Sequence, residues 1–154
     1  MDALLFELAD ARYALAIAYV REVVRAVLVD PLPHAPAVIA GVINYRGVVI
    51  PVIDTRRRLG MPARPVALAD HFIIAEVAGR ALALHIEVPL DLTFVTPVPL
   101  GDVAPELRAA PYIAGVVPTH DGVLLIQDLP AFLSQDELAE LDHALATATQ
   151  GSAA

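Results

Sequence analysis

One sequence pattern occurs twice in this chain, and it limits the folds that the chain can adopt. The segment IAGVINYRGVVIPVID at residues 39–54 aligns with IAGVVPTHDGVLLIQD at residues 113–128. Each copy has an apolar run, a polar turn that contains glycine, a second apolar run and a closing aspartate, which is typical of two short strands joined by a turn. A weaker repeat relates the segment around Phe6 to that around Phe72. The sequence therefore predicts one small β unit present twice, over roughly residues 3–60 and 70–130.

Short strands also account for the rest of the first half. Apolar residues alternate over residues 4–8 and 13–17, on either side of the polar link Asp10-Ala11-Arg12, which predicts a β-hairpin. The valine-rich segment 19–29 predicts a brief helical turn that leads into a strand. Three prolines in DPLPHAP, residues 30–36, then predict a loop, because proline lacks an N–H and restrains the residue before it.

The first copy of the repeat contains the most specific local signals. Asn44-Tyr45-Arg46-Gly47 predicts a tight hairpin turn, since Asn and Gly tolerate positive φ, and we expect its Tyr45 and Arg46 side chains to point outward. Pro51 predicts that the second strand lies at a sheet edge or carries a bulge, because proline cannot donate to a ladder. Asp54 is expected to N-cap a short helix over residues 55–59, and Gly60 to end it.

The strongest helical pattern lies near the C-terminus. Ser134 and Glu137 form a capping box, and Leu138, Leu141 and Leu145 follow at helical spacing. These signals predict a helix over about residues 134–147 that packs on the β structure. Residues 147–154 have no apolar pattern and are expected to fray.

Composition and charge exclude several classes of function. The 154 residues suit one domain, and the net charge of −8 repels phosphate and anionic lipid, so we expect no nucleic-acid partner and no membrane insertion. The basic cluster Arg56-Arg57-Arg58 with Arg64 is interpreted as a solvated helix surface. No segment reaches the ~18–20 apolar residues of a membrane-spanning helix. With no signal peptide pattern and no cysteine, the sequence predicts a cytoplasmic protein.

Residues suited to catalysis or metal binding are scattered along the chain. None of the five histidines has a metal-ligand spacing with another, so neither a metal nor a cofactor is expected. His85 and Glu87 alternate along one expected strand and would share a face, which favours an acid–base pair. No nucleophile, third orienting group or phosphate-binding loop accompanies them, and the prediction is that the protein is not an enzyme.

Several segments together resemble one family. The core GVINYRGVVIPVIDTRRRLG at residues 41–60 is preceded by YALAIAYVREVV and LPHAPAVIAG and followed by GRALAL, PYIAGVV, DGVLLIQDL and LSQDELAELDHAL. This combination resembles the CheW-type coupling proteins of bacterial chemotaxis over roughly residues 4–145. The resemblance implies a mainly β fold in a single domain over residues 1–154, with two small five-stranded SH3-like β-barrels that share a core, a short helix after Asp54 and a C-terminal helix.

The resemblance also implies a function. Members of this family are non-catalytic adaptors that join the cytoplasmic tip of a chemoreceptor to the regulatory domain of a CheA-type histidine kinase, so the chain is expected in the cytoplasm with recruitment to membrane receptor arrays. Other members serve pilus-motility or surface-sensing pathways, and a divergent scaffold of that kind is the alternative. Two further hypotheses are an enzyme that uses His85 and Glu87 and a barrel that binds a small ligand.

The receptor-facing positions of the family correspond here to residues on two segments, YVREVV and GVINYRG. Arg46 presents five donors from a turn, which suits carbonyls or carboxylates on a helical tip, and Val20 supplies an apolar floor. Without the family, Val20 is equally consistent with a core valine and Arg46 with an ordinary solvated turn residue. The expected receptor-binding set is Val20, Glu22, Gly41, Asn44, Arg46 and Gly47.

The kinase-facing edge of the family corresponds to the strand at residues 48–53 and its end at Asp54. The alternative for this segment is a barrel strand in which Asp54 only caps a helix. The expected kinase-binding set is Val48, Val49, Ile50, Pro51 and Asp54.

The sequence departs from the family at four positions. His85 stands where an aliphatic residue is usual, Glu87 where Asp is usual, and Thr55 where Leu commonly follows the aspartate; Pro89 lies inside an expected strand. These departures concern the interface of the second barrel rather than the fold, and they favour a specialised set of partners.

Overall fold

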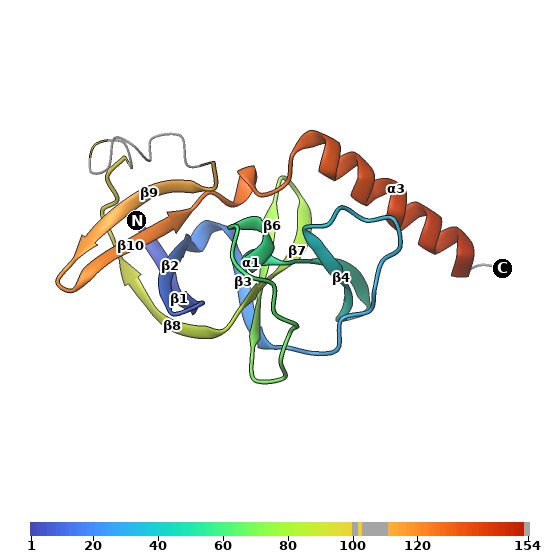
Figure 1. The fold of residues 1–154 in the computed structure, drawn as a ribbon, viewed down its shortest axis with the longest axis horizontal. Coiled ribbons are helices and arrows are strands. Elements are labelled where there is room, and N and C mark those ends of the chain that lie inside the picture. Colours follow the sequence, from blue (N-terminus) through green and yellow to red (C-terminus); the bar gives the residue numbers. More distant parts are fainter. Residues whose placement is uncertain (100–101, 103–110, 153–154) are drawn as a thin grey trace.

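The computed structural model describes residues 1–99, 102 and 111–152, in which the strands form two five-stranded sheets (Figure 1). Each sheet curls into a small barrel, and the two barrels lie side by side with a C-terminal helix that projects past one of them (Figure 1). Barrel A has the strand order β8-β1-β2-β10-β9, and barrel B has the order β3-β6-β7-β5-β4. The predicted pair of five-stranded barrels is confirmed.

Barrel A combines strands from both ends of the chain. The hairpin β1–β2 pairs antiparallel, as predicted, and Ala9 and Asp10 form its turn with φ of 53° and 63°. Strand β2 then pairs parallel with β10, and β1 pairs antiparallel with β8. The strands are β1 (Asp2–Leu8), β2 (Ala11–Ala16), β8 (Val88–Phe94), β9 (Ile113–Thr119) and β10 (Gly122–Gln127).

Barrel B occupies the continuous stretch between β2 and β8. A short 3-10 turn, η1 (Ile17–Tyr19), leads into its first strand, as the sequence predicts. The hairpins β4–β5 and β6–β7 are antiparallel, and the second turns at Ala78 and Gly79. The strands are β3 (Val20–Arg25), β4 (Ile39–Tyr45), β5 (Val48–Ile53), β6 (His71–Val77) and β7 (Arg80–Ile86).

The prediction that Pro51 marks an edge strand is wrong. Strand β5 lies between β7 and β4 in the sheet. Strand β5 pairs with β7 only through Val52 and Ile53. The β5–β7 ladder therefore begins after Pro51, and the N–H that proline lacks is not needed for it. The irregularity in the β4–β5 pairing falls between Ile39 and Gly41 instead.

The strands of the two sequence repeats are interleaved. Strands β1 and β2 of the first repeat join β8, β9 and β10 of the second, whereas β6 and β7 join β3, β4 and β5. Both barrels close in the same way, because Asp30 bridges Val42 on β4 and Val98 bridges Val116 on β9. The two repeats therefore build the same closure at equivalent points of the two barrels.

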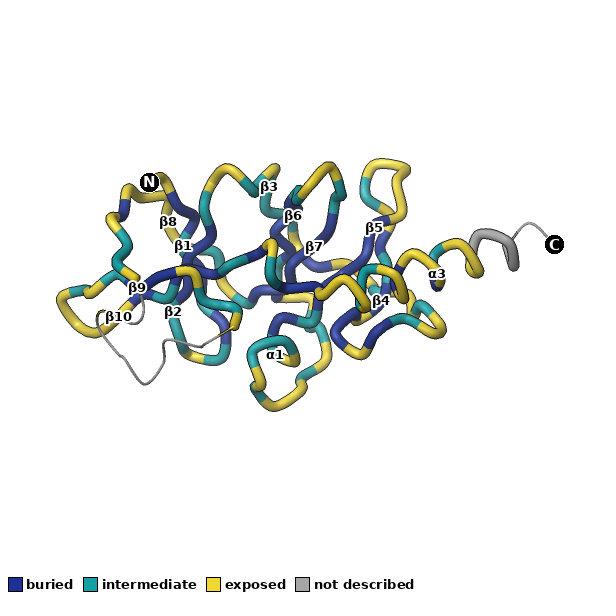
Figure 2. Tube along the Cα trace, turned by 90° about the horizontal axis from the view of Figure 1, so that it is seen from above, coloured by how far each residue is buried: buried dark blue, intermediate teal, exposed yellow. Residues whose placement is uncertain are grey.

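The core runs through both barrels. One buried cluster joins Phe6 and Leu15 of barrel A to Ile73 and Leu84 of barrel B and to Leu141 of the C-terminal helix. Figure 2 shows buried segments running through the middle of the molecule from β2 to β7. Strand β6 is buried on both faces, because Ile73 and Ala75 enter this cluster while Phe72 and Ile74 enter a second cluster inside barrel B. The two barrels therefore share a core, as the resemblance implied.

Two helices flank barrel B. Helix α1 (Thr55–Arg58) begins at Asp54, whose Oδ1 accepts from the N–H of Arg57 at 3.1 Å, as predicted. Helix α3 (Gln135–Ser152) begins with the predicted capping box, in which the Ser134 N–H donates to Glu137 at 2.9 Å and the Glu137 N–H donates to Ser134 Oγ at 3.1 Å.

The predicted end of the C-terminal helix near residue 147 is wrong, since α3 continues to Ser152. Among the described side chains, Ala144 and Leu145 are the last of this helix to contact the core, and alanine and glutamine beyond them favour its continuation. Residues 153–154 of the predicted frayed tail lie outside the described residues. None of the described helices is long and apolar enough to cross a membrane.

Candidate functional site

The β4–β5 turn is built as a two-residue hairpin loop. Tyr45 and Val48 are the last paired residues, and Arg46 and Gly47 between them have φ of 51° and 85°. Positive φ at both loop positions matches the right-handed twist of the flanking strands. The side-chain oxygen of Asn44 accepts from the N–H of Gly47 at 2.8 Å, which fixes the turn. Arg46 is therefore held at the tip with 73% of its side chain exposed.

Strand β3 brings Glu22 to this turn. Arg46 Nη2 donates to Glu22 Oε2 at 3.0 Å, and the Tyr45 hydroxyl donates to Glu22 Oε1. The Arg46 guanidinium also lies over the Tyr45 ring, 5.1 Å from its centre. The hydrogen bond to Glu22 raises the pKa of Tyr45. Tyr45 was expected to point outward, but its hydroxyl turns back to Glu22, while Arg46 is exposed as expected.

The remaining residues of the expected receptor-binding set lie nearby with different exposure. Asn44 and Gly47 are exposed in the turn, and Val20 is half-buried at the start of β3, where it packs against the main core cluster. Gly41 is buried, and a Cβ there would lie 2.2 Å from the backbone oxygen of Asp30. The close approach of Asp30 and Val42 at the barrel closure explains glycine at this position without any partner.

The expected kinase-binding strand exposes only its beginning. Val48 and Val49 are 58% and 59% exposed, whereas Ile50 is 2% exposed and Pro51 is buried. Asp54 lies beyond the strand as the cap of α1, with 19% of its side chain exposed. A partner that contacts this segment therefore meets the side chains of Val48 and Val49, and Ile50 belongs to the core of barrel B.

An exposed apolar stripe along β8 was missed from the sequence. Val88, Leu90, Leu92 and Phe94 are 45%, 37%, 66% and 70% exposed, although alternation of this kind usually marks a buried face. Leu92 and Phe94 line a hollow of about 350 Å³ together with Ile17 from η1. Since η1 leads directly into β3, this hollow connects the stripe to the junction between the two barrels. The alternation of apolar residues along β8 was a sequence signal of a stripe, but it does not tell whether the stripe is buried or exposed.

His85 and Glu87 do not form an acid–base pair. His85 Nε2 lies 2.8 Å from Asp70 Oδ2, and Glu87 accepts from Arg56 and from the N–H of Ala9 in the β1–β2 turn. Arg64 links the two groups, at 3.0 Å from both oxygens of Asp70 and 3.3 Å from Glu87. Among the described residues, no three His, Asp or Glu side chains gather where they would hold a metal ion.

These ion pairs lower the pKa values of both carboxyl groups. Burial raises the pKa of Asp70, but hydrogen bonds from the Ala67 N–H, from Arg64 and from His85 outweigh it. Burial likewise raises the pKa of Glu87, and Arg56 and the Ala9 N–H outweigh it. Both groups are therefore ionised near neutral pH, and neither is a proton donor there.

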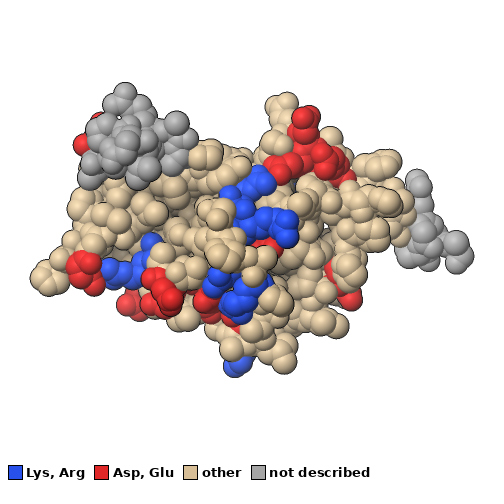
Figure 3. All heavy atoms as spheres, in the orientation of Figure 1, with Lys and Arg blue, Asp and Glu red and all other residues tan. Residues whose placement is uncertain are grey.

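The interpretation of the arginine cluster as a solvated surface is wrong for two of its members. Arg56 is 12% exposed and pairs with Glu87, and Arg58 is 14% exposed and binds Glu137 at 2.7 and 2.8 Å. Arg57 is 53% exposed and fits the interpretation. Figure 3 shows basic side chains gathered in the middle of this face, around the position of α1. Arg56 and Arg58 are poorly exposed because they pair with carboxylates that are distant in the sequence, and the spacing of residues does not reveal such partners.

Comparisons with known proteins agree on one family. The family described as the CheW-like domain matches residues 2–137. The chain is 30% identical over 135 residues to the chemotaxis protein CheW of Rhizobium meliloti (strain 1021), with 86% of each chain covered. It is 35% identical over 120 residues to Protein FrzA of Myxococcus xanthus, with 73% of this chain and 71% of that protein covered. The crystal structure of the scaffolding protein TtCheW from Thermoanaerobacter tengcongensis matches with a TM-score of 0.74 and 27% identity, covering 88% of this chain and 94% of that one.

Proposed function

Because this chain belongs to the CheW-like domain family, we propose that it is a non-catalytic signalling adaptor that couples a chemoreceptor to a CheA-type histidine kinase. The observation that carries the proposal is the meeting of Glu22, Tyr45 and Arg46 at one corner of barrel B. These residues come from two elements and are held by a turn whose geometry is specified by its own sequence. A preorganised, exposed charged corner of this kind suits specific binding more than stability, because surface ion pairs contribute little to folding.

The receptor-binding surface proposed here combines this corner with the hollow at the barrel junction. Ile17, Leu92 and Phe94 provide apolar surface, and Val20 lies at the start of the strand that follows η1. A helical tip presents apolar residues on one face and carboxylates or carbonyls beside them. In the bound state the apolar face packs into the hollow, and Arg46 donates its unused hydrogen bonds to the polar groups.

The kinase-binding surface proposed here is centred on Val48 and Val49. Strand β5 is inside the sheet, so addition of a partner strand along it is not available and side-chain contacts must supply the binding energy. Val48 and Val49 are exposed on opposite faces of β5 beside the Arg46 turn. A partner that wraps around the end of this hairpin therefore contacts apolar side chains next to a charged rim, a composition typical of transient signalling interfaces. Asp54 is proposed at the margin of this surface, and Ile50 and Pro51 support it from below.

The match to Protein FrzA favours a second candidate, a scaffold in a related chemosensory pathway such as pilus motility or surface sensing. Both candidates use the same surfaces and differ only in the identity of the kinase and receptor. An enzyme that uses His85 and Glu87 has no support from the geometry, because each side chain is held in ion pairs with other partners.

The proposal is tested by size-exclusion co-elution with the regulatory domain of each histidine kinase, and separately with the receptor tip, from the same organism. Val49→Glu is expected to weaken kinase binding at least ~10-fold and Arg46→Glu to weaken receptor binding by a similar factor. Val123→Glu is the matched control, since Val123 is the equivalent residue of the second repeat and is 52% exposed. Absence of binding to every kinase and receptor, or equal losses for Val49→Glu and Val123→Glu, contradicts the proposal.

A further inference from the structure

A hollow on barrel B, between the β3–β4 loop and the loop after α1, shares only Asp54 with the binding surfaces proposed above. It encloses about 670 Å³. Three aliphatic side chains on its rim face solvent, with Val27, Leu28 and Leu68 exposed by 49%, 81% and 76%. Exposed aliphatic side chains that gather around a concave surface are typical of a binding site, because most of a soluble protein's surface exposes such residues only singly.

His85 forms part of the wall of this hollow and has an unused hydrogen-bonding atom. Its side chain is 2% exposed, and its Nε2 lies 2.8 Å from the Asp70 carboxylate. A carboxylate only accepts, so the proton of Nε2 faces Asp70, and in the neutral imidazole Nδ1 carries the lone pair. Among the described residues, none hydrogen-bonds this Nδ1. Nδ1 is not one of the fully buried polar atoms without a partner, and His85 lines the hollow, so this nitrogen can accept from a group bound there.

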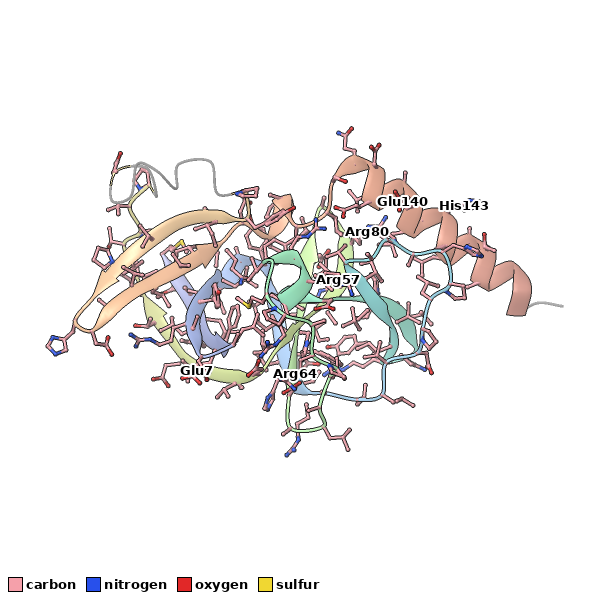
Figure 4. The ribbon with its side chains drawn as sticks, viewed as in Figure 1. Glu7, Arg57, Arg64, Arg80, Glu140 and His143 are labelled. Atoms are coloured by element: carbon pink, nitrogen blue, oxygen red, sulfur yellow. The ribbon has the colours of Figure 1, made fainter. Side chains whose placement is uncertain are left out.

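The charged groups of the hollow leave one cation and one anion available. Arg64 is held by both oxygens of Asp70 at 3.0 Å. Arg57 and Asp54 are only loosely paired, since Arg57 Nε and Asp54 Oδ2 are 3.8 Å apart, which is too long for a hydrogen bond. Arg57 and Arg64 both lie on the side of barrel B that carries α1 (Figure 4). Arg57 can therefore donate to an anionic group, and Asp54 can accept from a cationic one.

We propose that this hollow binds a small zwitterion with an aliphatic body, the chemical class of the aliphatic α-amino acids. The ligand's carboxylate accepts from Arg57, and its ammonium group donates to Asp54 and to Nδ1 of His85. Its aliphatic side chain packs against Leu28 and Leu68, which face water in the empty hollow. A simple anion offers no donor to Nδ1 of His85 or to the Asp54 oxygen that does not cap α1, and a simple amine offers no acceptor to the Arg57 guanidinium. The proposal is independent of the adaptor function.

Isothermal titration calorimetry with three matched compounds tests the ligand class. L-leucine is expected to bind with a dissociation constant of about 0.1–1 mM, as befits a ligand of few atoms. The same skeleton without the ammonium group, 4-methylpentanoate, and without the carboxylate, isoamylamine, are each expected to bind at least ~10-fold more weakly. Equal binding of leucine and 4-methylpentanoate, or no binding of leucine at about 10 mM, overturns the proposal.

Variants and a spectroscopic measurement test the residues. Arg57→Gln and Leu68→Ser replace exposed side chains and are each expected to weaken leucine binding about 10-fold, whereas Val123→Gln, on β10 of the other barrel, leaves it unchanged. Leucine is also expected to shift the ¹⁵N resonance of His85 Nδ1, because hydrogen bonding changes the shielding of that nitrogen. Leucine binding that Arg57→Gln leaves unaltered, or that does not move the His85 resonance, contradicts the assignment of the site.

Discussion

Thr55 places a polar side chain in the protein interior at the start of helix α1. It is fully buried at the first position of α1, and its hydroxyl has no hydrogen-bond partner among the described residues. A buried hydroxyl without a partner lowers stability, because it loses its hydrogen bonds to water on folding.

The first prediction follows from this hydroxyl. Thr55→Val keeps the shape of the side chain and removes the unpaired oxygen, so the free energy of unfolding should rise by about 1 kcal/mol. Urea denaturation measures the change, and Thr93→Val, at an exposed position of β8, is the control, expected within about 0.5 kcal/mol of wild type. A loss of stability in Thr55→Val would mean that the hydroxyl is satisfied in the folded protein.

Gly41 supports a second prediction at the residue scale. Gly41→Ala places a Cβ 2.2 Å from the Asp30 backbone oxygen at a φ of +153°, so the closure of barrel B must open. We expect a loss of about 3 kcal/mol or more in chemical denaturation. Gly60→Ala is the control, because Gly60 also has positive φ but open space around it, and its loss should be about 1 kcal/mol. Similar losses in both variants would show that the close approach is unimportant.

At the scale of elements, the pair Arg58–Glu137 fastens α1 to the start of α3. Hydrogen bonds from Arg58 lower the pKa of Glu137 from 4.5 to about 2, against the opposing effect of burial. A lowered pKa in the folded state contributes stability above pH 4.5, and this contribution is lost as the pH falls from 4.5 towards 2. The Glu137 side chain is 22% exposed, so solvent screening reduces the contribution to about 1–2 kcal/mol.

The third prediction is the effect of removing this charge. Glu137→Gln should lose about 1–2 kcal/mol of unfolding free energy near pH 7, and the difference from wild type should shrink as the pH falls towards 2. Denaturation curves at several pH values provide the measurement. Glu140→Gln, on an exposed position of the same helix (Figure 4), is the control and should change stability little. A difference that is independent of pH would contradict the ionic origin of the effect.

Element positions were largely predictable from the sequence, whereas element partners were not. The Asp54 cap, the Asn44–Gly47 turn and the Ser134 capping box depend on neighbours within four residues, and all three were confirmed. Arg56 and Arg58 were misinterpreted because their carboxylate partners lie 31 and 79 residues away. The contact between Glu22 and the Arg46 turn was hidden for the same reason, and nothing local to β8 tells which face of its alternation meets water.

At the scale of the whole molecule, the shared core predicts that the two barrels unfold together. One buried cluster contains residues of both barrels, and Glu87 accepts from Arg56 of barrel B and from the Ala9 N–H of barrel A. We expect a single calorimetric transition whose van't Hoff and calorimetric enthalpies agree. Two resolved transitions would show that the barrels are independent units.

The fifth prediction concerns Glu87 as the link between the two barrels. Glu87→Gln leaves the poorly exposed Arg56 without its charged partner, so the midpoint of thermal unfolding should fall by about 5–10 °C while the transition stays single. Asp121→Asn breaks the exposed pair with Arg12 and is the control, with an expected change of about 2 °C or less. Equal shifts would mean that Glu87 contributes no more than a surface charge.

Because the strands of the two repeats are interleaved, the two barrels cannot be completed in the order in which they begin during synthesis on the ribosome. All five strands of barrel B are present once Ile86 has emerged, because they follow one another without interruption. At that moment the β1–β2 hairpin still lacks β8, β9 and β10, and Phe6 and Leu15, fully buried in the finished protein, have no complete barrel to enter. A chain that stops before β10 therefore has every strand of barrel B but leaves the barrel A side of the shared core uncovered, and exposed apolar surface of this kind is what chaperones and proteases recognise.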